Sequence, residues 1–281
     1  MDILINELSL DGQYTNENDF LNSLKKILPI IKIINNLNFS LQKNYTFYSS
    51  KVTTSKTFSD IIKLNNVAME KDKKTQLKSY LLKLSNTPPY WNDTQIHNCS
   101  DKYFYNDNDV CDTSLAETYE RDKIVLSFDH INFLAEWLSV QKNGLNSDIY
   151  NISDKNNFLE HLQSIKQIDM LNFCKEKFKN SNLNFDFLDN NYGFDILNTL
   201  QQREFIDTFN IFIQLDWHTI LSHSKLNYKQ YKGTEINYQN KTIDKFRVTG
   251  TSNTNRCFGY RENNTFYILR FEVDHSLSDN G

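Results

Sequence analysis

Apolar positions recur along the chain with two patterns, one typical of helices and one typical of strands. Residues 1–150 contain both patterns. Short apolar runs at residues 3–8 and 124–128 are bounded by polar residues and predict buried strands. Apolar positions recur at helical spacing over residues 20–34, where Pro29 predicts a kink or a restart of the helix. Because helices alternate with buried strands here, we expect an α/β region over residues 1–150.

The same part of the chain carries weaker helical patterns and one long polar stretch. Residues 91–112, rich in Asn and Asp, predict a long loop or an irregular hairpin. Shorter helices are expected at residues 57–62, 73–84, 114–121 and 133–138.

After residue 150 the chain becomes helical and then changes to the period of strands. Ser153 and Asp169 are the expected caps of two short helices, and residues 201–221 predict a longer amphipathic helix. Strands are expected at residues 243–248, 256–261 and 265–273, with a hairpin turn at 262–264. We therefore expect an α+β fold, with helices and a small antiparallel sheet over residues 151–281 following the α/β region.

Composition excludes several classes of protein. Of 281 residues, 39% are hydrophobic and 14% aromatic, which is too apolar for a disordered chain. A net charge of −4 excludes a protein that coats nucleic acid through bulk charge, but leaves room for a local basic patch. No apolar run is long enough to span a bilayer, and the first residues lack the features of a secretory signal. We expect a cytoplasmic protein with no membrane contact, whose four scattered cysteines are reduced.

Arginine is concentrated near the C-terminus. The chain has six arginines, and four of them lie among the last three expected strands: Arg247, Arg256, Arg261 and Arg270. A guanidinium group binds phosphate through two parallel hydrogen bonds and stays charged in a partly dry site. Arg247 and Arg256 lie on neighbouring expected strands, so they converge with Tyr260 and His275 if those strands pair antiparallel. Such a cluster holds a phosphate, and His275 supplies a general acid or base.

The C-terminal segment resembles the strand core of the RelE/ParE toxin superfamily. The resemblance covers about 40 residues and rests on Phe246-Arg247-Val248, Asn255 to Tyr260, Phe266 to Phe271 and Asp274-His275. It implies a small sheet packed on helices, here residues 201–221, and, as in many members of the superfamily, cleavage of mRNA. By position, Arg247 and Arg256 would bind phosphate and His275 would be the acid or base. The tyrosine that often completes the catalytic set is missing after His275, which leaves a binding-only version of the fold as an alternative.

Three N-terminal segments are similar to uncharacterised prokaryotic proteins from mobile-element and phage-defence neighbourhoods. They are residues 6–13, Pro88-Pro89-Tyr90-Trp91 and Ser114-Leu115-Ala116-Glu117. This second resemblance assigns no chemistry, but it favours an antiviral defence or toxin role.

A second candidate site is acidic. Asp112, Glu117 and Asp129 flank an expected helix and buried strand, in a layout that loosely resembles PIN-like nucleases. Carboxylates gathered at strand ends bind Mg²⁺ or Mn²⁺ for two-metal phosphodiester hydrolysis. The alternative function is therefore a metal-dependent nuclease.

A third candidate site would bind zinc, but its sequence pattern is weaker. His97, Cys99 and Cys111 have a spacing that begins a zinc site, and His130 would be the fourth ligand. Strong zinc signals contain paired short spacings such as Cys-x-x-Cys, and this segment has none.

We expect a nucleic-acid-acting effector, a metal-independent endoribonuclease that uses Arg247, Arg256, Tyr260 and His275 on RNA. A protein partner such as an antitoxin is compatible with this function. The non-catalytic alternative is a subunit that recognises a protein partner through exposed aromatics such as Tyr103, Phe104 and Tyr105.

Overall fold

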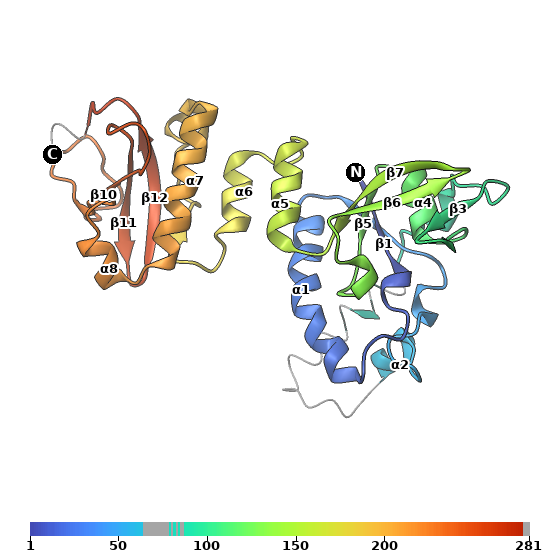
Figure 1. Ribbon diagram of the computed structural model, residues 1–281. Coiled ribbons are helices and arrows are strands. Elements are labelled where there is room, and N and C mark those ends of the chain that lie inside the picture. The colour runs from blue at the N-terminus through green and yellow to red at the C-terminus, as the bar shows by residue number, and fades with distance from the viewer. Residues whose placement is uncertain (64–78, 80, 83, 85–86, 278–281) are drawn as a thin grey trace. The chain divides into compact units, whose positions relative to one another are not determined.

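The chain forms two compact units, residues 1–160 and 161–281, which Figure 1 draws as ribbons. The computed structural model describes residues 1–63, 79, 81–82, 84 and 87–277. The boundary between the units falls inside helix α5 (Lys155–Ser164), close to the change in pattern after residue 150. The helix expected over residues 73–84 lies almost entirely outside the described residues.

A seven-stranded mixed sheet organises the first unit, in the order β2-β1-β5-β7-β6-β3-β4. Its strands are β1 (Asp2–Ile5), β2 (Ser40–Gln42), β3 (Tyr103–Tyr105), β4 (Asn108–Asp109), β5 (Ile124–Leu126), β6 (Trp137–Lys142) and β7 (Leu145–Ile152). The helices described in this unit are α1 (Glu17–Asn36), α2 (Phe58–Lys63), α4 (Ser114–Glu120) and the start of α5, with short 3-10 turns at Glu7–Ser9, Phe47–Ser49, Trp91–Thr94 and Ile131–Phe133.

The centre of this sheet is parallel and buried. Strand β1 pairs in parallel with β2 and β5, and β5 pairs in parallel with β7. Ile124, Val125 and Leu126 of β5 are buried in succession, as expected for a strand covered on both faces. Helix α1 connects β1 to β2 and runs through Pro29 without ending there, so it does not restart at the proline.

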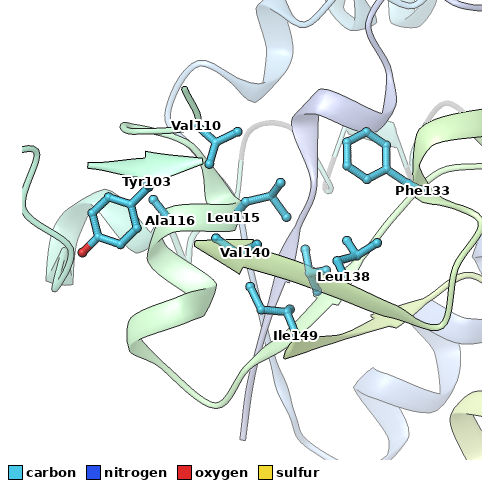
Figure 2. Packing of buried hydrophobic residues seen from close by; sticks show 9 residues of the cluster. Tyr103, Val110, Leu115, Ala116, Phe133, Leu138, Val140 and Ile149 are labelled. Carbon is cyan, nitrogen blue, oxygen red and sulfur yellow. The ribbon is translucent and has the colours of Figure 1, made fainter. Parts of the chain in front are cut away.

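A hydrophobic cluster joins helix α4 to strands β3, β5, β6 and β7. Figure 2 shows the side chains that point toward one another in this cluster. Those labelled are Tyr103, Val110, Leu115, Ala116, Phe133, Leu138, Val140 and Ile149. Tyr103 is fully buried, so the expectation that it is an exposed interface residue is wrong.

The helix expected at residues 133–138 is also wrong, because β6 begins at Trp137 and forms a hairpin with β7. Leu138 and Val140 are buried while Trp137 and Ser139 are exposed, which is the period of a strand. The hairpin turns at Asn143-Gly144, where both residues have positive φ. Asn-Gly is the preferred sequence for such a turn.

The second unit contains a five-stranded sheet in the order β8-β12-β11-β10-β9. Its strands are β8 (Leu183–Asn184), β9 (Lys229–Gln230), β10 (Asp244–Arg247), β11 (Arg256–Glu262) and β12 (Thr265–Glu272). Its helices are the end of α5, α6 (Met170–Lys177), α7 (Thr199–Gln214) and α8 (Trp217–Ser222), with 3-10 turns at Asn190–Tyr192 and Phe194–Ile196. The pairs β10–β11 and β11–β12 are antiparallel as expected. Two strands that were not expected extend the sheet, with β9 antiparallel to β10 and β8 parallel to β12.

Helix α7 packs along one face of this sheet (Figure 1). Asn198 caps it in a reciprocal capping box with Gln201. The ring of Phe209 meets the rings of Phe246 and Phe271, with centroids 6.4 and 6.1 Å apart. The single helix expected over residues 201–221 is two helices, because the chain leaves helical geometry at Leu215 and Asp216 caps α8.

Helices and two mixed sheets together confirm the α+β class. Among the helices that the structure describes, none combines the length and the apolar character that crossing a membrane requires.

Candidate functional site

Three strands of the second unit bring charged side chains into one row. Arg247 of β10 lies directly opposite Arg256 of β11, and Arg256 lies opposite Glu272 of β12. Directly opposed residues of antiparallel strands project from the same face of a sheet. Two of the predicted site residues, Arg247 and Arg256, are therefore neighbours on one face.

Two residues away along each strand, the same face carries further cations. Lys245 lies opposite Phe258, which lies opposite Arg270. The Arg270 guanidinium stacks over the ring of Tyr192, 3.6 Å from its centroid, and the Lys245 ammonium lies 5.3 Å from the centroid of Tyr231. This face of the small sheet thus carries four cations, of which Lys245 and Arg256 are buried, and the buried carboxylate of Glu272.

Arg256 is held in place by the loop that precedes it. Its side chain is almost buried, and Nη1 donates hydrogen bonds to the carbonyl oxygens of Asn253 and Asn255 at 2.6 and 2.9 Å. The other terminal nitrogen, Nη2, lies 3.1 Å from Nε2 of His275. The structure thus joins the expected phosphate-binding arginine to the expected acid or base.

His275 has a partner for Nε2 in either protonation state of that atom. Nε2 lies 3.1 Å from the Arg256 guanidinium and 3.3 Å from the carbonyl oxygen of Asn253. Without a proton, Nε2 accepts from the guanidinium; with a proton, it donates to the carbonyl. The side chain is partly exposed, so a substrate can reach it. The guanidinium is a partner only for the unprotonated Nε2, so this contact orients the ring as a base beside the phosphate-binding arginines.

Arg247 is the more accessible of the two arginines and carries an unused donor. Its side chain is partly exposed, yet its Nε atom is buried and has no hydrogen-bond partner among the described residues. Buried polar atoms nearly always have a partner in native proteins. Because Nε is shielded from solvent, a bound phosphate would pair with it only after the Arg247 side chain turned outward, where its guanidinium could offer paired donors.

Tyr260 does not join this cluster. It lies four residues beyond Arg256 on β11, which is about 13 Å along the strand. Its ring stacks on Tyr267 and Tyr238, with centroids 4.8 and 5.5 Å apart, and only 4% of its surface is exposed. Burial raises the pKa of its hydroxyl, as do nearby Tyr238 and Glu262. Tyr260 is a packing residue of the sheet.

Glu204 of α7 fixes the loop that holds Arg256, and sequence reasoning missed it. Its Oε1 accepts hydrogen bonds from the backbone N–H and hydroxyl of Thr251 at 2.6 and 2.7 Å, and its Oε2 accepts from Asn255 at 3.2 Å. Because Glu204 is far from this loop in the sequence, no local pattern could have identified it.

The acidic alternative is not assembled in the first unit. Glu117 Oε2 lies 2.5 Å from His97 Nδ1, and its Oε1 accepts from Arg121 Nε at 2.5 Å. Asp129 instead forms an ion pair with Lys26 of α1. Asp112 lies on the far side of the imidazole, 3.6 Å from His97 Nε2. The three carboxylates do not converge on one Mg²⁺ or Mn²⁺ site.

Burial raises the pKa of Glu117, but hydrogen bonds from His97, Arg121 and the backbone outweigh this effect and hold the pKa below its usual range. Glu117 is thus a buried anion whose charge is already compensated, which leaves it poorly suited to bind a metal directly.

The cysteines and His130 differ from the expectation. Cys99 and Cys111 form a disulfide, so the expectation of four reduced cysteines is wrong, while Cys174 and Cys257 are free and buried. The two bonded cysteines come together because the loop between them folds back through β3 and β4. His130 caps a 3-10 turn through Nδ1, which accepts from the N–H of Asn132 at 3.1 Å.

Comparison with protein-family models, with curated proteins and with solved structures finds no match to this chain. The geometry of its own residues therefore carries the functional argument.

Proposed function

We propose that the second unit binds single-stranded RNA and cleaves it without a metal ion, using Arg247, Arg256 and His275. The observation that carries this proposal is the 3.1 Å contact between Arg256 Nη2 and His275 Nε2, with Arg247 directly opposite Arg256 on the next strand. The resemblance to the RelE/ParE superfamily supports the same function. Together with the N-terminal resemblance, it supports a role in prokaryotic antiviral defence or in a toxin–antitoxin pair.

The roles of the three residues follow from their chemistry. The guanidinium groups of Arg247 and Arg256 hold the non-bridging oxygens of one phosphate and stabilise the negative charge that grows on them during the reaction. When RNA binds, Arg256 Nη2 turns from His275 Nε2 to a phosphate oxygen, and the lone pair of Nε2 that is thereby released removes the proton of the ribose 2′-hydroxyl. The 2′-oxygen then bonds to phosphorus, the bond from phosphorus to the 5′-oxygen breaks, and the leaving 5′-oxygen takes a proton from water, while His275 returns its proton to the solvent. The products are a 2′,3′-cyclic phosphate and a 5′-hydroxyl end, so RNA is cleaved and DNA is not.

Cleavage of a labelled single-stranded RNA in excess EDTA tests this function. We expect the native chain to cut in EDTA, His275→Gln to lose about 10²- to 10⁴-fold in rate, and Arg256→Gln to lose about 10²-fold or more. Because Arg256 also holds its loop, Arg247→Gln provides a partly exposed second variant with the same expected direction. Arg261→Gln is the matched control: Arg261 lies on the same strand, but its guanidinium stacks over Trp217.

Full cleavage by both Arg247→Gln and Arg256→Gln would refute the proposal. Loss of activity in EDTA with recovery in Mg²⁺ or Mn²⁺ would refute its metal-independent chemistry. RNA binding without turnover would support the binding-only alternative. Absence of both binding and turnover, with a co-purifying protein partner, would support a recognition subunit instead.

A further inference from the structure

Four potential metal ligands gather in the first unit, whereas the arginine cluster belongs to the second. They are His97, Cys99, Cys111 and Asp112, and one ligand atom of each lies within 4.8 Å of the others. Three of the four are the residues whose spacing suggested zinc, and Asp112 occupies the place expected for His130. In the described part of the chain, no other group of at least three such side chains is this compact.

The imidazole of His97 is oriented as it is in metal sites. Its Nδ1 lies 2.5 Å from the Glu117 carboxylate, while its Nε2 faces Asp112 at 3.6 Å and the side-chain amide of Gln95 at 3.3 Å, a contact that a metal ion would replace. Metal-binding histidines almost always donate their second N–H to a carboxylate or carbonyl, which fixes the ring and raises its basicity. Nε2 is therefore the atom that His97 presents to the cluster.

Glu117 is itself held rigidly. Its carboxylate accepts hydrogen bonds from the backbone N–H groups of Ile96 and His97 at 3.1 Å and from Arg121 Nε at 2.5 Å. The rings of Trp91 and Tyr103 flank the imidazole, with centroids 5.3 and 6.1 Å away. These contacts fix the orientation of the His97 ring before a metal ion binds, so binding costs little side-chain entropy at this residue.

The donor set suits zinc. Two thiolates, one imidazole nitrogen and one carboxylate oxygen form the four-coordinate mixture that Zn²⁺ takes in proteins, whereas Mg²⁺ prefers oxygen ligands. A tetrahedral site needs its two sulfur atoms about 3.8 Å apart. The Cα atoms of Cys99 and Cys111 are 5.8 Å apart, which allows this spacing by side-chain rotation. His97 is buried, whereas Cys99 and Asp112 are exposed, so the site opens to solvent.

We propose that His97, Cys99, Cys111 and Asp112 form a Zn²⁺ site that is available only when the Cys99–Cys111 disulfide is reduced. A thiol reductant transfers two electrons and two protons to the disulfide, giving two protein thiols and one oxidised reductant disulfide. Zn²⁺ then binds both sulfur atoms as thiolates, and the two thiol protons are released to water. The disulfide and the zinc site exclude each other because they use the same two sulfur atoms.

Both the disulfide and the proposed zinc ion close the same loop. The disulfide closes the loop between Cys99 and Cys111, which contains β3 and β4. Zinc closes the same loop and also attaches it to His97, beside α4. When Zn²⁺ is present, reduction therefore replaces one cross-link of this loop by another.

Co²⁺ and Zn²⁺ binding to the full chain, reduced with a phosphine, tests the site. We expect one Co²⁺ per chain, with the tetrahedral visible bands and the thiolate-to-cobalt charge-transfer band, and displacement by one Zn²⁺. The oxidised chain should give neither band. Cys99→Ser should remove the charge-transfer band or weaken binding by at least about 100-fold, and Asp112→Asn should weaken binding about tenfold or more. His130→Gln is the control and should bind as the native chain does.

Thermal unfolding of the native chain provides a second test, which is needed if a variant that lacks one of the metal ligands is unstable. Zn²⁺ should raise the thermal midpoint of the reduced native chain by several degrees and leave that of the oxidised chain unchanged. The proposal is overturned if the reduced chain binds no Zn²⁺ at micromolar concentration. It is equally overturned if Co²⁺ binds without the charge-transfer band, or if binding is unchanged in a folded Cys99→Ser, Cys111→Ser double variant.

Discussion

At the scale of single residues, Lys43 shows how burial changes a charged group. Its side chain is buried in the first unit, where the ammonium donates to the carbonyl oxygen of Thr87 and lies 4.5 Å from the ring centroid of Tyr90. Burial lowers the pKa of Lys43 to about 8. An unfolded lysine keeps a pKa of about 10.4. Between these values the unfolded chain binds more protons than the folded chain, so this group makes stability rise with pH.

We therefore predict that Lys43→Met changes the pH dependence of stability. Below pH 8 the native fold carries the cost of a buried charge, up to roughly 3 kcal/mol, which the variant lacks. The stability of the native chain relative to the variant should increase from pH 8 to 10.5. Urea unfolding of both chains at several pH values measures this difference, with the exposed Lys32→Met as control. A difference that is constant over this range would contradict the assigned pKa.

At the scale of elements, the β11–β12 hairpin positions the arginine row. Its register shifts between Phe258 and Gly259, and this bulge lets Phe258 pair with Arg270 while Gly259 pairs with Ile268. A Cβ atom at position 259 would lie 2.1 Å from the carbonyl oxygen of Tyr267 and 2.7 Å from the ring of Phe266. Glycine is required here because two parts of the hairpin approach too closely for any side chain.

We predict that Gly259→Ala destabilises the second unit by about 2 kcal/mol or more, because the backbone of β12 must move to make room. Hydrogen exchange of peptides from β11 and β12 measures the effect directly. Thr265→Ala, a partly exposed position at the start of β12, is the control and should leave protection nearly unchanged. Equal protection in the native chain and in Gly259→Ala would show that the bulge does not depend on glycine.

At the scale of the whole molecule, the sequence could predict what depends on local period and could not predict what depends on distant packing. The three strands around Arg247, Arg256 and Arg270 follow from alternating apolar residues and a turn at Glu262 to Asn264, so their pairing was predictable. The separation of Tyr260 from the cluster was not, because it depends on how Tyr238 and Tyr267 pack around the ring.

The first unit also has some features that the local pattern predicts and others that depend on contacts between distant residues. The buried strands β1 and β5 were predictable from their apolar runs. The Asn143-Gly144 sequence by itself predicts a hairpin turn. The apolar residues before it have helical spacing, and for that reason a helix was expected where β6 lies. The contact of Glu117 with His97, however, joins a helix to a polar loop that has no regular period.

The central claim is that Arg247 and Arg256 on one face of the small sheet bind the phosphates of RNA. The salt dependence of RNA binding tests this claim most directly. The measurement uses His275→Gln as the parent, since it should bind RNA without cutting it, and titrates a short single-stranded RNA at several salt concentrations. We predict that adding Arg247→Gln or Arg256→Gln weakens binding about tenfold and lowers the slope of log Kd against log salt by about one. Adding Arg261→Gln should change neither. Unchanged affinity and slope in both the Arg247 and Arg256 variants would contradict the account.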